Sequence, residues 1–293
     1  MRGEARLFGV LGDPVEHSLS PAMHNSAFAA RGMRHLYLRY QVPLEALPEA
    51  LDEARTLDMG GLNLTVPLKE AALPLVDEVT AEAERIGAVN TIVHRDGRLV
   101  GDNTDARGFL RAIMSRVRLE RAQVVVIGAG GSARAVGTAL ASAGCDRVTI
   151  ANRTVSRAQE LAERLSALGG ARVAATGLDA LEAADVLAGA SLVVNTTSTG
   201  LSAEGIVIRH TMTPRHCLFM DLVYGAEPTP FLRAATRARR PALDGTGMLL
   251  HQGALAFEAW TGEPAPLDAM RRALGQAGLP VADAKPSAGR GGN

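Results

Sequence analysis

VVVIGAGGSARAV, at residues 124–136, is the stretch that decides the fold. The apolar run before Gly128 predicts a buried parallel strand, and the alanine-rich run over 133–143 predicts a helix. Gly128, Gly130 and Ala133 have the G-x-G-x-x-G/A spacing of a dinucleotide-binding turn, in which backbone approaches a pyrophosphate closely. The phosphates would bind the free N–H groups at the start of the helix. Similar glycine turns also join strands to helices for structural reasons alone.

Further apolar runs at 147–151, 191–195 and 218–223 alternate with helical patterns along the chain. This alternation predicts an α/β fold with a doubly wound, Rossmann-like parallel sheet. Ligands bind at the carboxyl ends of the strands in such sheets. We therefore expect Thr197, Ser198 and Tyr224 to lie near the nicotinamide end of a bound dinucleotide.

Composition indicates a protein that binds small molecules. The chain has 293 residues, enough for two domains, and its 31 basic and 31 acidic residues favour neither nucleic acid nor a membrane surface. Two cysteines and seven histidines form no metal-binding motif, so we expect no metal. The N-terminus does not resemble a signal peptide, and no apolar run approaches the roughly 20 residues that span a bilayer. The sequence predicts a soluble, cytoplasmic protein.

The segment HSLSPAMHN, at 17–25, follows a short predicted strand at 7–11. Ser20 and Pro21 predict the start of a helix, with Ser20 as N-cap and Pro21 as the first helical residue. The hydroxyls of Ser18 and Ser20 beside a helix N-terminus would also suit an anion such as a carboxylate. Sequence leaves open whether Ser20 does more than cap the helix.

Two charged residues lie at predicted strand ends. Lys69 follows the strand that turns into a helix at Pro67, where the helix dipole disfavours a cation, so it is either a solvated lysine or a functional one. Asp105 follows a predicted hairpin over 88–100 and precedes a helix predicted over 108–117. It is either a helix-start acid or a group in a cleft at the domain boundary.

The second strand of the dinucleotide unit ends in Asn152 and Arg153, and Arg157 lies about one turn further on. An acid at this place would hydrogen-bond the ribose 2′-hydroxyl of NAD, whereas arginine accommodates the 2′-phosphate of NADP. The missing acid and the two guanidinium groups favour NADP. The alternative is that both arginines are merely exposed around Thr154, acting as a helix N-cap.

The last stretch predicts a helix from about residue 246 to Trp260, in which Gln252 is either a buried amide or a ligand-binding group. Residues 280–293 are rich in Gly, Pro, Ala and Ser and predict a flexible tail. We expect a substrate-binding catalytic domain over 1–104 and 245–279, and an NADP-binding domain over 105–244. A cleft would separate the two domains.

Seven ordered segments together resemble the shikimate dehydrogenase family over nearly the whole chain to about Gly262. They are HSLSPAMHN (17–25), NLTVPLK (63–69), GAVNT (87–91), NTDARGF (103–109), GAGGSARAV (128–136), NRT (152–154) and GTGMLLHQGALAFEAWTG (245–262). The resemblance implies reversible, NADPH-dependent reduction of 3-dehydroshikimate to shikimate in chorismate and aromatic amino-acid biosynthesis.

The resemblance also implies roles for particular residues. Ser18 and Ser20 would hold the substrate carboxylate, while Thr65, Lys69, Asn90, Asp105, Gln252 and Tyr224 would contact the ring hydroxyls. The NADP(H) contacts would be Gly128, Ala129, Gly130, Gly131, Ser132, Asn152, Arg153, Thr154, Arg157, Thr197, Ser198, Leu222 and Gly245. Because hydride transfer to a ketone leaves an oxygen that needs a proton, we assign Lys69 as general acid, and as base in reverse, with Asp105 orienting it.

Two other functions stay open at this point. One is a quinate/shikimate dehydrogenase that uses NAD, which the missing acid near Asn152 disfavours. The other is a non-catalytic regulator that senses a dinucleotide, which would be expected to lose Lys69 or Asp105, whereas this chain keeps both. The protein would be a monomer or a homodimer.

Overall fold

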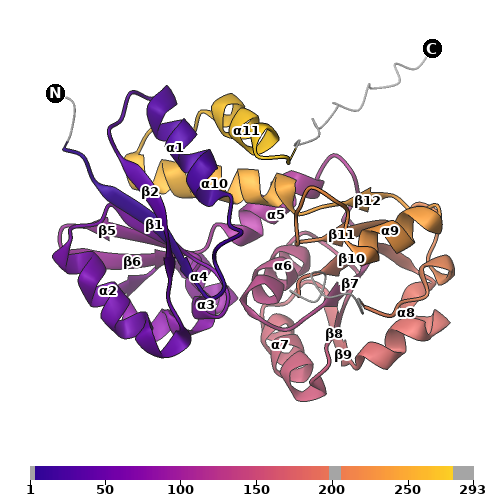
Figure 1. The fold of residues 1–293 in the computed structure, drawn as a ribbon. Helices are drawn as coiled ribbons and strands as arrows, with labels where there is room; N and C mark the ends of the chain where they lie inside the picture. Colours follow the sequence, from indigo (N-terminus) through magenta and orange to yellow (C-terminus); the bar gives the residue numbers. More distant parts are fainter. Residues whose placement is uncertain (1–3, 198–205, 280–293) are drawn as a thin grey trace, which may run out of the picture.

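The computed structural model describes residues 4–197 and 206–279 (Figure 1). The predictions for Ser198 and for the tail over 280–293 lie outside the described residues. Within the described part, two six-stranded sheets lie side by side, each covered by helices. No helix in these ranges is long and apolar enough to cross a membrane.

The second sheet is parallel throughout and has the strand order β12-β11-β10-β7-β8-β9. This is the 3-2-1-4-5-6 order of the doubly wound fold, so the predicted fold class is confirmed. The strand order reverses between β7 and β10, whose carboxyl ends therefore border the crevice where ligands bind. The strands are β7 (Gln123–Ile127), β8 (Arg147–Ala151), β9 (Arg172–Thr176), β10 (Ala190–Asn195), β11 (Leu218–Asp221) and β12 (Ala242–Leu243). The helices around them are α6 (Gly131–Ser142), α7 (Val155–Ala167), α8 (Ala184–Leu187) and α9 (Pro230–Arg237).

The first sheet is mixed and has the order β2-β1-β3-β5-β6-β4. Its strands β5 and β6 form the antiparallel hairpin predicted from Asp96-Gly97, with Arg95 opposite Arg98. The strands are β1 (Leu7–Gly12), β2 (Leu36–Gln41), β3 (Gly61–Leu64), β4 (Glu78–Val79), β5 (Thr91–Arg95) and β6 (Arg98–Asp102). The helices that accompany them are α1 (Ser20–Ala30), α2 (Leu47–Thr56), α3 (Leu68–Ala71) and α4 (Ala81–Ile86).

Two helices join the sheets. α5 (Asp105–Ile113) leads from β6 into the second sheet, and α10 (Thr246–Thr261) packs along α5 as the chain returns from β12 (Figure 1). At the far end of α10, Trp260 Nε1 donates to the carbonyl of Ile92 on β5 over 2.9 Å. α11 (Leu267–Gln276) then packs on α1. The C-terminal helices therefore belong with the first sheet.

Two predicted helix starts are wrong. Ser20 is the first residue of α1 rather than its N-cap, which is Leu19, and the Ser20 side chain caps nothing. The hydroxyl of Ser18 instead accepts from the Ser20 N–H over 3.3 Å, and this moves the start of the helix back by one residue. α5 begins at Asp105 rather than at 108, because the Asn103 side chain accepts from the Asp105 N–H over 3.0 Å.

A buried histidine predicts how stability changes with pH. His24 is fully buried, stacks on Tyr37 at 4.5 Å and has no hydrogen-bond partner on either ring nitrogen. Burial lowers the pKa of His24 from 6.5 to about 3, so below pH 6.5 the unfolded chain binds a proton that the folded one does not. We expect this group to cost about 1.4 kcal/mol of unfolding free energy per pH unit as the pH falls from about 6 to 3.5.

His24→Phe should flatten this acid loss, measured by urea unfolding at several pH values. The exposed His17 of the same segment offers a matched variant, His17→Phe, which should keep the slope of the parent protein. Equal slopes for the parent and His24→Phe would contradict the assignment.

Candidate active site

Lys69 and Asp105 face each other between the two sheets. Lys69 is the second residue of α3, and Asp105 is the first residue of α5. The ammonium Nζ donates to Asp105 Oδ2 over 2.6 Å and to the hydroxyl of Ser132 over 3.2 Å. Their side chains are only 13% and 5% exposed. The pair therefore lies beside the predicted glycine turn and is largely shielded from solvent. Charges interact more strongly in such surroundings than in water.

Lys69 is the only lysine between residues 4 and 279, since the other lysine of the chain is Lys285. Every other cation of fixed charge in that range is an arginine. Arginine cannot release its proton in a protein, whereas a lysine ammonium can. The use of lysine at this one place fits a group that transfers a proton better than a group that only supplies charge.

Asn90 connects two other predicted site residues, Asp105 and Gln252. Its side-chain Nδ2 donates to Asp105 Oδ1 over 2.8 Å and lies 3.4 Å from Gln252 Oε1. Its Oδ1 accepts from the backbone N–H of Thr104 over 2.8 Å. Gln252 in turn donates to the carbonyl of Leu249 over 3.0 Å. Asn90, Asp105 and Gln252 are all buried, so these bonds fix the carboxylate that faces Lys69.

The serines of HSLSPAMHN lie beside two tyrosines. The phenol of Tyr224, which follows β11, lies beside Ser18, and burial raises the pKa of the phenol. The buried phenol of Tyr37 lies near Ser20, and burial raises the pKa of the phenol strongly. Both phenols are therefore neutral and can act as hydrogen-bond donors at physiological pH. The structure thus brings Ser18 and Tyr224 together across the two sheets.

The polar chain continues from Tyr37 toward the lysine. Tyr37 OH donates to Asn63 Oδ1 over 2.7 Å, and Asn63 Nδ2 donates to the carbonyl of Asn90 over 3.1 Å. Thr65 follows Asn63 at the carboxyl end of β3, and its carbonyl accepts from the N–H of Leu68 at the start of α3 over 2.8 Å. Tyr37, Asn63 and Asn90 therefore form one hydrogen-bonded set that leads to the Lys69–Asp105 pair.

The glycine turn lies against Lys69. Gly128 has a φ of +117°, and a Cβ there would lie 2.4 Å from Thr196 Oγ1, so only glycine fits. A Cβ on Gly131 would lie 2.9 Å from the Cβ of Lys69, so glycine also permits the close approach of α3 to α6. Gly130 is the N-cap of α6 and offers no side chain to the helix N–H groups. An uncapped helix start after such a turn is the kind of site that binds a phosphate anion.

The end of β8 presents the predicted arginines to solvent. Arg153 and Arg157 are both exposed, and Asn152 Nδ2 donates to the carbonyl of Thr154 over 2.9 Å. Thr154 is the N-cap residue of α7, but its side chain makes no capping bond. Two exposed guanidinium groups, at a strand end that itself carries no acid, suit a phosphate better than a ribose hydroxyl, although Arg157 also lies 3.7 Å from the carboxylate of Glu70 on α3.

A buried carboxylate fixes the ends of β10 and β11. Asp221 accepts from Asn195 Nδ2 over 2.9 Å and from the hydroxyl of Thr229 over 2.6 Å. Asn195 Oδ1 accepts from the N–H of Thr197 over 3.0 Å. Burial raises the pKa of Asp221. The next residue, Leu222, donates its N–H to the Asn195 carbonyl over 2.9 Å.

Sequence reasoning missed three groups at the site. Tyr37 and Asn63 carry only the signal of a strand, and Asp221 only that of a strand end. The signal that could have found Asp221 is its place at the carboxyl end of a strand beside the crevice. Nothing local in the sequence marks Tyr37, because the hydrogen-bond partner of its phenol, Asn63, lies on another strand. The structure also brings two of the predicted cofactor residues together, since a Cβ on Gly245 would lie 2.0 Å from the Leu222 carbonyl oxygen.

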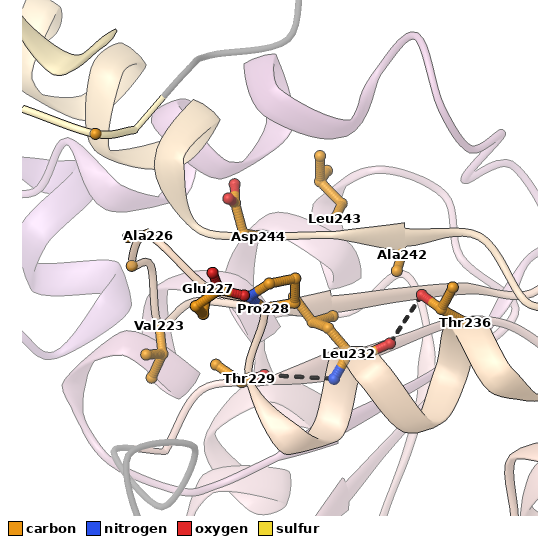
Figure 2. Close-up of a pocket in the computed structure, with 12 residues that line it drawn as sticks. Val223, Ala226, Glu227, Pro228, Thr229, Leu232, Thr236, Ala242, Leu243 and Asp244 are labelled. Atoms are coloured by element: carbon orange, nitrogen blue, oxygen red, sulfur yellow. Dashed lines mark hydrogen bonds between the residues drawn. The ribbon is translucent and has the colours of Figure 1, made fainter. Parts of the chain in front are cut away.

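A cavity of about 250 Å³ lies between the loop after β11, helix α9 and strand β12 (Figure 2). Thr229 accepts from the Leu232 N–H and Thr236 donates to the Leu232 carbonyl along its α9 wall (Figure 2). None of the predicted site residues lines it. The residues that line it are Val223, Gly225, Ala226, Glu227, Pro228, Thr229, Leu232, Thr236, Ala242, Leu243, Asp244 and Gly278.

A Rossmann-type sheet whose glycine turn lies beside the Lys69–Asp105 pair, together with a separate mixed sheet, defines a dinucleotide-dependent oxidoreductase built on two α/β sheets. Three family models match the chain: the shikimate dehydrogenase substrate binding domain over 10–92, shikimate / quinate 5-dehydrogenase over 111–223, and the shikimate 5′-dehydrogenase C-terminal domain over 245–274. The chain belongs to the shikimate dehydrogenase family.

Similar proteins align over almost their whole length. The shikimate dehydrogenase (NADP(+)) of Methanopyrus kandleri is 44% identical, covering 92% of this chain and 95% of that protein. The structure of shikimate 5-dehydrogenase from Thermus thermophilus with NADP(H) and shikimate is 43% identical, with a TM-score of 0.81 over 93% of this chain and 99% of that one. Quinate dehydrogenase from Corynebacterium glutamicum with NAD is 34% identical, with a TM-score of 0.82 over 93% and 99%.

Proposed function

We propose that the protein is an NADP-dependent shikimate dehydrogenase that reversibly reduces 3-dehydroshikimate to shikimate, an oxidoreductase acting on a CH–OH group in chorismate and aromatic amino-acid biosynthesis. The observation that carries this proposal is the 2.6 Å contact between Lys69 Nζ and Asp105 Oδ2 beside the glycine turn. The similarity to NADP-dependent relatives over most of the chain supports the same activity.

Lys69 donates a proton to the oxygen of the ketone as that oxygen gains charge, and removes it in the reverse direction. Asp105 holds the ammonium in place through Oδ2 and is itself held by Asn90 through Oδ1. The same carboxylate hydrogen-bonds the reacting hydroxyl. Asn90, Thr65 and Gln252 contact the other ring hydroxyls, and Tyr224 contributes from the second sheet.

The carboxylate of the substrate binds Ser18 and Ser20. Two neutral phenols beside these serines leave the anion with hydroxyl partners and no competing negative charge. The residues between the two serines and Lys69, from Tyr37 through Asn63 to Asn90, would then set how far the ketone lies from the carboxylate. This distance would help to distinguish ring substrates of different shape.

The residues around the glycine turn fit NADP(H). Gly128 to Ser132 and the uncapped start of α6 suit the pyrophosphate, and Asn152 to Thr154 with Arg157 suit the 2′-phosphate. The bound nicotinamide supplies the hydride. Thr197, Leu222 and Gly245 contact its end of the cofactor, and Asp221 holds the two loops that carry Thr197 and Leu222. Ser198 is assigned to the same end.

Arg153→Ala tests the choice of cofactor. We expect KM for NADPH to rise about tenfold or more, because a charge-assisted hydrogen bond to phosphate contributes roughly 1.5–3 kcal/mol. KM for NADH should change no more than about twofold, since NADH lacks the 2′-phosphate. Steady-state kinetics with each cofactor measures both. An equal rise for NADPH and NADH would contradict the 2′-phosphate role.

The activity itself is tested by following nicotinamide absorbance with purified protein and four pairs of reactants. The pairs combine NADPH or NADH with 3-dehydroshikimate or 3-dehydroquinate. We expect the highest kcat/KM for NADPH with 3-dehydroshikimate. A preference for NADH with 3-dehydroquinate would indicate the quinate dehydrogenase alternative, and cofactor binding without turnover of either substrate would indicate a dinucleotide-sensing regulator.

We further propose the division into a substrate domain over 1–104 and 245–279 and a cofactor domain over 105–244. The two separate sheets and the return of α10 and α11 to the first sheet support it. We also propose that the protein acts in the cytoplasm, as a monomer or a homodimer. Size-exclusion chromatography with light scattering distinguishes the two states.

A further inference from the structure

Glu70, the neighbour of Lys69 on α3, contacts the second sheet's helices through its carboxylate. Its Oε2 accepts from Arg134 Nε over 3.1 Å and lies 3.0 Å from Arg134 Nη2. Its Oε1 lies 3.7 Å from Arg157 Nη2. The Glu70 and Arg134 side chains are 33% and 20% exposed, so this ion pair is partly shielded from solvent. None of the roles proposed above uses Glu70 or Arg134.

The Glu70–Arg134 ion pair and Lys69 both belong to the contact between α3 and α6. Lys69 meets Gly131 and Ser132, at the start of α6, while Glu70 meets Arg134, the fourth residue of the same helix. Gly131 and Arg134 are three residues apart and so lie on the same face of α6. Because α3 has only four residues, Glu70 and Lys69 must move together.

We propose that Glu70 and Arg134 are positioning residues that tie the two domains together and hold Lys69 against the glycine turn. The proposal rests on the function proposed above. The ion pair can form only when α3 lies on α6, so it favours this arrangement of the two domains over one in which these helices are apart. Even an ion pair of modest strength then raises the fraction of molecules in which Lys69 lies against the glycine turn.

The charges of the pair also bear on cofactor binding. Glu70 Oε1 would lie 3.9 Å from a Cβ on Gly130, so a carboxylate stands next to the predicted pyrophosphate site. A free carboxylate there would repel phosphate, and its charge is offset mainly by Arg134 at 3.0 Å and less by the exposed Arg157 at 3.7 Å. Loss of Arg134 alone should therefore weaken NADPH binding more than loss of Glu70 alone. A contact with a purely structural role would not produce this asymmetry.

The test is a double-mutant cycle with Glu70→Gln, Arg134→Gln and the double variant, using shikimate dehydrogenase kinetics and NADPH fluorescence titration without substrate. Glu70→Gln should lower kcat about fivefold without raising KM for NADPH. Arg134→Gln should lower kcat similarly and also weaken NADPH about tenfold. The double variant should bind NADPH within about threefold of the parent protein, because the repelling charge is gone.

The exposed pair of Arg118 and Glu120 on the same domain is the matched control, and Arg118→Gln and Glu120→Gln should change neither quantity. Arg134→Lys keeps the positive charge and should bind NADPH with the affinity of the parent protein. This result would show that the weaker binding of Arg134→Gln comes from the lost charge and not from misfolding. Equal NADPH affinities in Arg134→Gln and the double variant, or an unchanged kcat in Glu70→Gln, would overturn the proposal. The NADPH titration measures the effect of the Glu70–Arg134 pair even if the parent protein turns over neither substrate. A failure of the proposed function can therefore be distinguished from a failure of this proposal.

Discussion

Lys69→Ala should lower kcat at least about 100-fold, the lower end of what general acid–base catalysis contributes. KM for shikimate and for NADPH should stay within a few-fold, because the proton is transferred in the transition state rather than in the bound ground state. Steady-state absorbance kinetics at saturating concentrations of both reactants measures this. A small loss of kcat with a large rise of KM would instead make Lys69 a binding residue.

Lys69→Arg separates proton transfer from charge. The guanidinium group keeps the positive charge between Asp105 and Ser132 but cannot release a proton. We therefore expect kcat of Lys69→Arg to be as low as that of Lys69→Ala, to within about tenfold. Activity close to that of the parent protein would show that the charge suffices and that the proton comes from elsewhere.

Asp105→Asn should lower kcat about 100-fold, because the amide cannot hold the ammonium as the carboxylate does. The oxygen of the new amide could still accept from Asn90, but its NH2 group would then point at the Lys69 donor that now lies 2.6 Å from Oδ2. KM for shikimate should rise as well, since the same carboxylate is proposed to hydrogen-bond the substrate. The full pH profile of kcat and kcat/KM measures both effects.

Asp102→Asn is the matched control for Asp105→Asn. Asp102 is an acid three residues earlier that pairs with Thr80 and Arg107 and not with Lys69. Its loss should leave kcat within about twofold, as is usual for substitutions away from the reacting groups. If Asp102→Asn lost as much activity as Asp105→Asn, the effect would come from general charge or from folding.

The parallel sheet could be predicted because its signals are local. The apolar strands, the glycine spacing and the alternation with helices all fall within short windows of sequence. Helix starts were less secure, because they depend on which side chain captures a given N–H. At α1 this is the Ser18 hydroxyl, and at α5 it is the Asn103 amide. Residue preferences alone do not show which side chain accepts the N–H in either case.

The candidate site could be predicted where one segment carries the chemistry. Lys69 opposes the helix dipole, and Asn152 with the arginines after it marks a strand end, so each gives a signal of its own. The contacts among segments could not be predicted in the same way. Tyr37 is part of the site because its phenol hydrogen-bonds Asn63, which is 26 residues away in the chain. Glu70 is part of it because its carboxylate pairs with Arg134, which is 64 residues away. Only folding brings such pairs together.

Lys69 and Asp105 are proposed to act as one unit in moving a single proton. The most direct measurement is kcat of the double variant Lys69→Ala/Asp105→Ala beside the two single alanine variants. Groups that act as a unit are strongly non-additive, so the double variant should fall no more than about threefold below Lys69→Ala. Losses that multiply, so that the double variant falls a further 100-fold or so, would contradict the account.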